Sequence, residues 1–274
     1  MKSLKRNAAG FTLIELAIVL VIIGLLTAGI LVAQSLIRQS KINSIMTDAQ
    51  RYESAVSTFS SKYGALPGDI GNATTFWGAM TTCPPAPASA SPGGTLTCNG
   101  NNNGSVYNWL PPFTFTTINS NELQLFWQHL SNAQLISGSY TGISQLAGQT
   151  LDNMPGVSVP SSRLNGAGFS IVYAGTVPVG DATYGAFPGN YGHIFFVGGY
   201  FAGGFTINPI MTSGEASSFD GKYDDGVPSS GNITTISTTS AYADATCAIA
   251  SGSTFVYNVN NAGTHCALIL TTGF

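Results

Sequence analysis

Apolar residues are concentrated in one run near the N-terminus, from Phe11 to Ala33, in which Glu15 is the only charged side chain. A helix of this length would be about 35 Å long, enough to cross the hydrocarbon core of a bilayer. A secretory signal peptide has a shorter apolar core and ends in a cleavage site of small residues, which this run lacks. The run therefore predicts a membrane-spanning helix over 11–33. Glu15 is expected to have a partner, because a carboxylate inside a bilayer costs about 2.5–3.5 kcal/mol on insertion scales.

After Ala33 the apolar residues recur mostly three or four positions apart, which is typical of one face of an amphipathic helix. They are Ile42, Ile45, Met46, Ala49, Tyr52, Val56, Phe59 and Tyr63. Gly64 follows and predicts the end of the helix. We therefore expect one helix over 11–63, of about 53 residues and about 80 Å. Its second half is expected to pack against the rest of the chain.

Residues 64–274 contain shorter patterns, separated by loops rich in Gly and Ser. Apolar runs rich in β-branched and aromatic residues predict strands, and two segments predict short helices. The expected helices are 120–135, with Asn119 as N-cap, and 209–220; the expected strands are 169–173, 194–197, 233–239, 254–259 and 267–272. Residues 79–118 are expected to form a long irregular loop. A long helix followed mostly by strands favours an α+β fold, in which an antiparallel sheet covers the second half of the helix.

Charge is scarce and mostly negative in this second part of the chain. Charged residues make up 8% of the 274 residues, against roughly 25% in a typical soluble domain. After Tyr63 only Arg163 and Lys222 are basic, whereas nine residues are Asp or Glu. Such a domain lacks the basic patch that binds phosphate backbones. No direct nucleic-acid binding is expected.

The four cysteines are Cys83, Cys98, Cys247 and Cys266, and all follow the predicted membrane span. An even number of cysteines in an exported domain indicates disulfides, although four cysteines allow three pairings. The prediction adopted is Cys83–Cys98 and Cys247–Cys266, because these pairs close short loops. No C-x-x-C spacing occurs, which argues against a zinc or redox site.

The sequence contains no motif of a known catalytic site. It has no G-x-S-x-G, no H-E-x-x-H and no glycine-rich loop ending in Gly-Lys-Ser/Thr. His129, His193 and His265 are scattered along the chain. His129 is expected to be a structural or surface histidine on the short helix, and the protein is not expected to be an enzyme.

The segment Gly10-Phe11-Thr12-Leu13-Ile14-Glu15, preceded by Lys2, Lys5 and Arg6, resembles the processing site of type IV prepilins and type II secretion pseudopilins. The resemblance implies that a prepilin peptidase cleaves after Gly10 and that Phe11 becomes the methylated N-terminus. It also implies that Glu15 aids assembly with other pilin subunits through the N-terminal helix. Residues 1–10 would then be a leader, 11–63 the long helix and 64–274 a periplasmic or extracellular head.

Three phrases of the head are similar to ones in large prepilin-type proteins of Gram-negative bacteria. The first is Leu66-Pro67-Gly68-Asp69 with Phe76-Trp77, and the second is Phe126-Trp127-Gln128-His129-Leu130. The third is Asp224-Asp225-Gly226-Val227-Pro228. They support the resemblance without assigning a role to their residues.

Asp220, Asp224 and Asp225 form the densest charge cluster of the head, within Asp220–Gly226. Two hypotheses fit them. A tight turn is the favoured one, with one carboxylate accepting backbone N–H bonds and the others facing water. The alternative is a calcium site, because calcium takes oxygen ligands on such loops and some pseudopilins, by resemblance, bind it in the head. Lys222 stands where a helix-loop-helix calcium site would place a ligand.

The resemblance implies a structural subunit of a type IV pilus or pilin-like filament. The alternatives are an adhesin or DNA-uptake minor pilin displayed on the filament, and a type II secretion pseudopilin. Glu15 argues against the pseudopilin of the filament tip, which tends to lack that acid, and the large head favours a minor subunit. Three basic residues before the apolar run, against Arg38 and Lys41 after it, favour an N-in orientation in the inner membrane before assembly. The filament would then lie in the periplasm or at the cell surface.

Overall fold

The computed structural model describes residues 12–81, 83, 94–107, 122–144, 152–177, 186–236, 246–252 and 254–274. The chain divides into two compact units, Met1–Ile42 and Asn43–Phe274. The expected leader, residues 1–10, and Phe11 lie outside the described residues.

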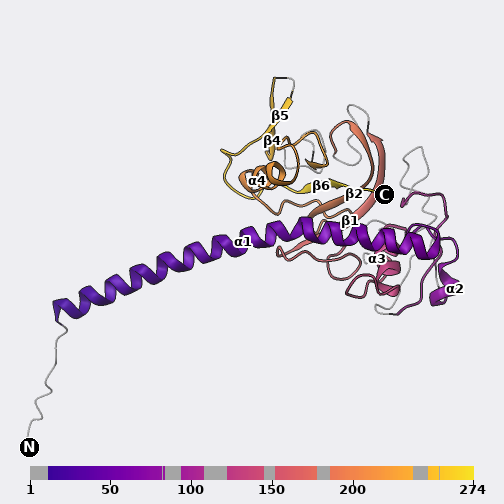
Figure 1. Ribbon diagram of the computed structural model, residues 1–274, viewed down its shortest axis with the longest axis horizontal. Helices are drawn as coiled ribbons and strands as arrows, with labels where there is room; N and C mark the ends of the chain where they lie inside the picture. Colours follow the sequence, from indigo (N-terminus) through magenta and orange to yellow (C-terminus); the bar gives the residue numbers. More distant parts are fainter. Residues whose placement is uncertain are drawn as a thin grey trace, which may run out of the picture. The chain divides into compact units, whose positions relative to one another are not determined.

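Helix α1, Leu13–Tyr63, is one continuous helix of 51 residues and confirms the predicted long helix (Figure 1). It ends at the predicted glycine. Gly64 has a φ of 75°, a conformation that favours glycine, and its N–H donates to the carbonyl of Ser60 at 2.9 Å.

The first unit contains the N-terminal part of α1, where the large apolar side chains from Leu13 to Ile37 are exposed. Among the described residues, α1 is the one helix long and apolar enough to cross a membrane, with a mean hydropathy of 3.0 in its most apolar window. A helix that is apolar on all sides needs an apolar surrounding, which is either lipid or other helices.

The second unit is built on a four-stranded antiparallel sheet in the order β1-β2-β6-β3. The strands are β1 Ala167–Val177, β2 Gly189–Gly199, β6 Leu268–Thr271 and β3 Ile233–Thr235. Strands β1 and β2 extend beyond the apolar runs that predicted them, because pairing with a neighbour decides where a strand ends. The expected strand at 233–239 is shorter, and residues 237–239 lie outside the described part.

A separate hairpin pairs β4, Ala248–Ser251, with β5, Thr254–Tyr257. Strand β4 was not predicted, since the short segment Ala-Ile-Ala-Ser carries little strand signal. Both predicted disulfides are present. Cys247–Cys266 joins the start of β4 to the residues before β6, and Cys83–Cys98 closes a loop in the irregular region that follows α2.

Three short helices complete the unit: α2 Ala73–Trp77, α3 Glu122–Asn132 and α4 Ser213–Tyr223. The expected cap of α3, Asn119, lies outside the described residues. The helix expected over 209–220 is present, but its bounds lie further along the chain, at Ser213–Tyr223. Thr212 is the N-cap: its side chain accepts the N–H of Glu215, and the Glu215 carboxylate accepts the N–H of Thr212. This capping box fixes the start of α4 at Ser213.

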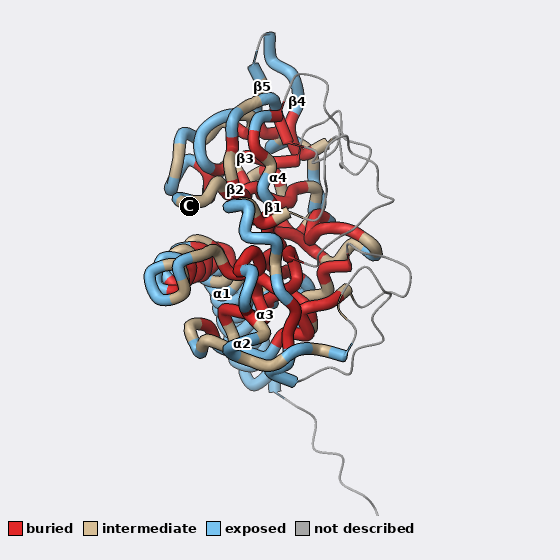
Figure 2. The backbone as a smooth tube through the Cα atoms, turned by 90° about the vertical axis from the view of Figure 1, so that its right-hand side faces the viewer, coloured by how far each residue is buried: buried red, intermediate tan, exposed pale blue. Residues whose placement is uncertain are grey.

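Within the second unit, the C-terminal part of α1 packs against both the sheet and α3, which lies beside it (Figures 1 and 2). The buried ring of Tyr52 shows this arrangement. It lies 5.2 Å from the ring of Phe169 on β1, 6.3 Å from that of Phe195 on β2 and 5.0 Å from Trp127 on α3. The α+β fold with an antiparallel sheet against the second half of the helix is therefore confirmed.

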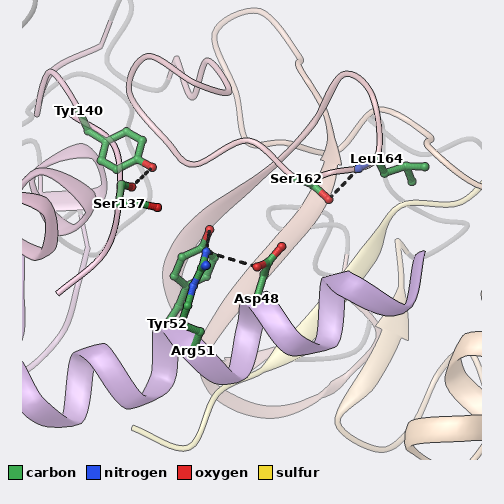
Figure 3. Close-up of polar contacts among 7 residues, drawn as sticks. All are labelled: Asp48, Arg51, Tyr52, Ser137, Tyr140, Ser162 and Leu164. Atoms are coloured by element: carbon green, nitrogen blue, oxygen red, sulfur yellow. Dashed lines mark hydrogen bonds and ion pairs between the residues drawn. The ribbon is translucent and has the colours of Figure 1, made fainter. Parts of the chain in front are cut away.

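An ion pair on α1 lies beside the ring of Tyr52. Asp48 Oδ1 lies 3.3 Å from Arg51 Nη2, and the Arg51 guanidinium covers the ring of Tyr52 at 5.2 Å from its centroid (Figure 3). The Asp48 side chain is almost fully buried, whereas about half of the Arg51 side chain is exposed. The buried carboxylate is thereby compensated by a cation at the surface.

Candidate functional site

Of the N-terminal motif, the structure describes the part from Thr12 onward, which includes Glu15. Gly10 and Phe11 lie outside the described residues. Glu15 Oε2 accepts hydrogen bonds from the main-chain N–H and the hydroxyl of Thr12, both at 2.8 Å. The N–H of Glu15 in turn donates to Thr12 Oγ1 at 3.3 Å. This reciprocal pair is a capping box, and it places a carboxylate at the helix N-terminus, where the helix dipole favours negative charge.

Thr12 therefore supplies a local partner for the acid that the sequence leaves isolated in an apolar run. The Thr-x-x-Glu spacing is the local signal that predicts this capping box from the sequence. The remaining acceptor capacity of the Glu15 carboxylate, which is exposed, is available to a positive group from outside the helix.

His129 lies at the centre of a buried polar network that joins two of the three phrases noted in the sequence. Its Nδ1 accepts the N–H of Gly68 at 2.9 Å, and its Nε2 lies 2.8 Å from Thr97 Oγ1. Because Nδ1 accepts, the proton of the neutral ring is on Nε2 and is donated to Thr97. The Thr97 hydroxyl donates onward to Gln128 Oε1 at 2.7 Å.

Burial lowers the pKa of His129 to about 3, so the ring is neutral at physiological pH. Its faces are covered by aromatic rings, with the Trp77 centroid at 5.3 Å and the Phe59 centroid at 6.4 Å. A histidine that donates to Thr97 cannot act as a base toward that hydroxyl. His129 is therefore a structural histidine, fully buried and without a surface role.

Two buried carboxylates hold the loop that follows Cys98. Asp69 accepts the N–H groups of Asn103 and Gly104, both at 2.9 Å. Glu122, at the start of α3, accepts those of Asn101 and Tyr107, both at 3.0 Å. These acids serve as hydrogen-bond acceptors for main-chain groups, which explains how they remain buried.

The other two histidines also bind main-chain groups. His193 accepts the N–H of Val106 at Nε2 and donates from Nδ1 to an oxygen of Phe274, both at 3.0 Å. Burial lowers the pKa of His193. His265 Nε2 lies 3.0 Å from the carbonyl of Ala262. In the described part of the chain the histidines are thus placed for structure, and none joins a nucleophile and an acid in a triad.

The acidic cluster differs in detail from the expected turn, because all three carboxylates accept hydrogen bonds. Asp220 is buried and accepts the Tyr257 hydroxyl at 2.7 Å and the N–H of Gly226 at 3.2 Å. Asp224 accepts the N–H groups of Asn232 and Ile233. Asp225 accepts the N–H of Val227 and the hydroxyl of Ser230, each at 2.8 Å.

One oxygen from each of Asp220, Asp224 and Asp225 lies within 4.8 Å of the others. Burial, with smaller contributions from the two neighbouring carboxylates, raises the pKa of Asp220 to about 6. The arrangement locks the turn after α4 to β3 and β5. It supports the turn as the role of these acids, since their oxygens already have donors.

A family model described as the prokaryotic N-terminal methylation motif matches residues 5–31. No curated protein and no solved structure matches the chain. The motif, the long apolar helix and the antiparallel sheet that packs on its second half together support a likeness to the type IV pilin and pseudopilin family.

Proposed function

We propose that this protein is a structural subunit of a type IV pilus or pilin-like filament. Prepilin peptidase would cleave it after Gly10 and methylate the new N-terminus at Phe11. The observation that carries the proposal is the methylation motif at residues 5–31, continued by a helix whose apolar side chains are exposed from Leu13 to Ile37. Such a helix is stable in lipid before assembly and against other such helices in a filament.

Glu15 has a specific part in this proposal. Its carboxylate, fixed by Thr12 at 2.8 Å, would pair with the positive amine of Phe11 of a neighbouring subunit. A buried ion pair of this kind contributes register more than stability, since desolvation offsets much of its attraction. The pair would set the axial position of one subunit relative to the next.

The protein would span the inner membrane once with its N-terminus inside, and its head would enter the filament on the outer side. Its partners would be the prepilin peptidase and other pilin subunits. No catalytic role is proposed, because none of the described histidines joins a nucleophile and an acid.

The test is mass spectrometry of sheared surface filaments and of the membrane fraction. The expected result is a chain that starts at N-methylated Phe11 and is present in the filaments. A chain that retains residues 1–10 in both fractions would refute the proposal. A chain that is processed but absent from surface filaments, and whose deletion blocks protein secretion, would support the pseudopilin alternative instead.

A further inference from the structure

A cavity of about 600 Å³ opens beside the C-terminal part of α1 in the second unit. Its lining comes from the helix, from Leu66 after the helix and from the last two residues of the chain. The lining residues are Glu53, Val56, Ser57, Ser60, Ser61, Leu66, Gly273 and Phe274. Four of them carry a carboxyl or a hydroxyl group, so the cavity is suited to a polar guest with several hydrogen-bond donors.

The far wall of the cavity is fixed by hydrogen bonds. The N–H of Thr272 donates to the carbonyl of His193 at 3.0 Å, and His193 Nδ1 binds an oxygen of Phe274 at 3.0 Å. The Phe274 ring packs against Phe126 and His193, with centroids 6.1 and 5.3 Å away. The cavity is therefore a preformed feature, which lowers the cost of ordering it on binding.

The Ser60 hydroxyl differs from those of Thr58 and Ser61 on the same part of α1. Thr58 and Ser61 donate to the carbonyls of Ser54 and Ser57, at 2.9 and 2.8 Å. The Ser60 hydroxyl oxygen is buried and has no hydrogen-bond partner among the described residues. A buried polar atom without a hydrogen-bond partner is destabilising, because it has lost its hydrogen bonds to water. A donor that entered the cavity would remove this cost.

Glu53 supplies negative charge to the same cavity. Burial raises the pKa of Glu53, and the hydrogen bond from the N–H of Gly273 partly offsets that rise. A half-buried carboxylate gains from a cation placed beside it, because the cation compensates the charge that burial disfavours. Glu53 is therefore the group of the cavity that would attract a positively charged guest.

The cations of the same unit are few, and most are already engaged. Residues 43–274 contain Arg51, Lys62, Arg163 and Lys222 as their basic residues. Arg51 pairs with Asp48, Lys62 lies over the ring of Tyr63 at 5.1 Å, and Lys222 binds Asn43 Oδ1 at 3.2 Å.

Arg163 is exposed on a short turn before β1 and forms no hydrogen bond or ion pair with the described residues. The turn itself is well fixed. The N–H of Leu164 donates to Ser162 Oγ at 3.2 Å (Figure 3), and the N–H of Ala167 donates to the carbonyl of Leu164 at 3.0 Å. The turn thus presents a guanidinium with five donors on a rigid support.

We propose that the Glu53 cavity of one copy receives the Arg163 side chain of the next copy of this chain. The guanidinium would bind the Glu53 carboxylate and donate to the free hydroxyl oxygen of Ser60. The cavity and the arginine lie on different surfaces of one chain, so the contact is head-to-tail, and in the proposed filament it would repeat from one copy to the next. The inference rests on the proposed filament function, which brings copies side by side.

The test uses the full chain with Arg163→Lys, which keeps the charge and introduces a primary amine. A carbodiimide joins an amine directly to a carboxylate in contact with it, and it leaves arginine unchanged. Membranes and sheared filaments from cells with this variant are treated and separated on reducing gels. Controls are the wild-type chain, which lacks an amine at position 163, and Arg163→Lys combined with Glu53→Gln.

We expect a dimer band at least fivefold stronger than in the wild type, containing a cross-linked peptide that joins Glu53 of one copy to position 163 of another. The band should fall to the wild-type level when Glu53 is replaced by Gln. No additional band, or a band that persists with Glu53→Gln, would overturn the inference. A processed chain that enters filaments without this cross-link would overturn the contact and leave the proposed function standing. A cross-linked chain that is never processed would refute the function and keep the contact.

Discussion

The buried histidine of the head makes stability depend on pH, and the size of the effect follows from its surroundings. Protonation of His129 would require breaking the bond from the N–H of Gly68 to Nδ1 inside a site covered by Phe59 and Trp77. The folded pKa is lowered to about 3 from an ordinary value of 6.5. A base with a lowered folded pKa stabilises the fold above its unfolded pKa, and this contribution is lost as the pH falls below 6.5.

The linkage between protonation and unfolding gives the size of this pH effect on stability. With these two pKa values, the free energy of unfolding falls by about 2 kcal/mol between about pH 7.5 and pH 5. The reason is that His129 becomes protonated in the unfolded chain over this range but stays neutral in the folded chain. Asp220 acts in the opposite direction, since its pKa is raised to about 6 and its contribution is lost as the pH rises through that value. His193, whose pKa is lowered, acts in the same direction as His129.

A comparison of variants isolates His129 from the other two groups, which remain in both chains. His129→Gln removes the titrating ring and also leaves the Gly68 N–H without its acceptor, which costs about 1–3 kcal/mol at about pH 7.5. Urea unfolding of the full chain in detergent, followed by tryptophan fluorescence, would measure the difference in stability between wild type and variant. That difference is expected to shrink by about 2 kcal/mol at about pH 5.

His265→Gln is the control for removing a histidine, because His265 lies in a loop, where its Nε2 is 3.0 Å from the carbonyl of Ala262. If removing His265 changes the pH dependence as much as removing His129 does, the effect is not specific to the buried ring. If the wild type and His129→Gln differ by the same amount at the two pH values, the assignment of a neutral, buried His129 as the source is wrong.

Three further predictions concern assembly, the hairpin and the acidic turn. Glu15→Ala should be cleaved normally but should be lost from sheared filaments on immunoblots, because it removes the acceptor for the Phe11 amine; normal incorporation would contradict this. Replacing both Cys247 and Cys266 by Ser should lower the free energy of unfolding by about 3 kcal/mol in urea titrations, given the sequence separation of 19; a change below about 1 kcal/mol would show that the bridge does not restrict the unfolded chain. Millimolar calcium should leave the melting temperature equal to that with a chelator, since the three Asp side chains already have donors. A calcium-dependent rise that Asp224→Ala abolishes would establish a metal site there.

Local signals in the sequence were sufficient for the elements that depend on neighbouring residues. The spacing of apolar residues predicted α1, and Gly64 predicted its end, because helix periodicity and glycine propensity act within a few positions. The methylation motif is likewise a continuous segment. The same reasoning missed the capping boxes at Thr12–Glu15 and Thr212–Glu215, although both patterns are local, and the second omission explains the misplaced start of α4.

The tertiary structure decided the contacts between residues that are far apart in the chain. His129 meets Gly68 across 61 positions, and Tyr257 meets Asp220 across 37. Burial and hydrogen-bond partners, rather than residue type, set the pKa and the role of each group. The sequence alone therefore determined the long apolar helix and the methylation motif at its start. Only the folded head decided that its histidines are structural, that the carboxylates of its acidic cluster hold a turn, and that Glu53 and Ser60 share one cavity, because those properties depend on which distant segments pack together.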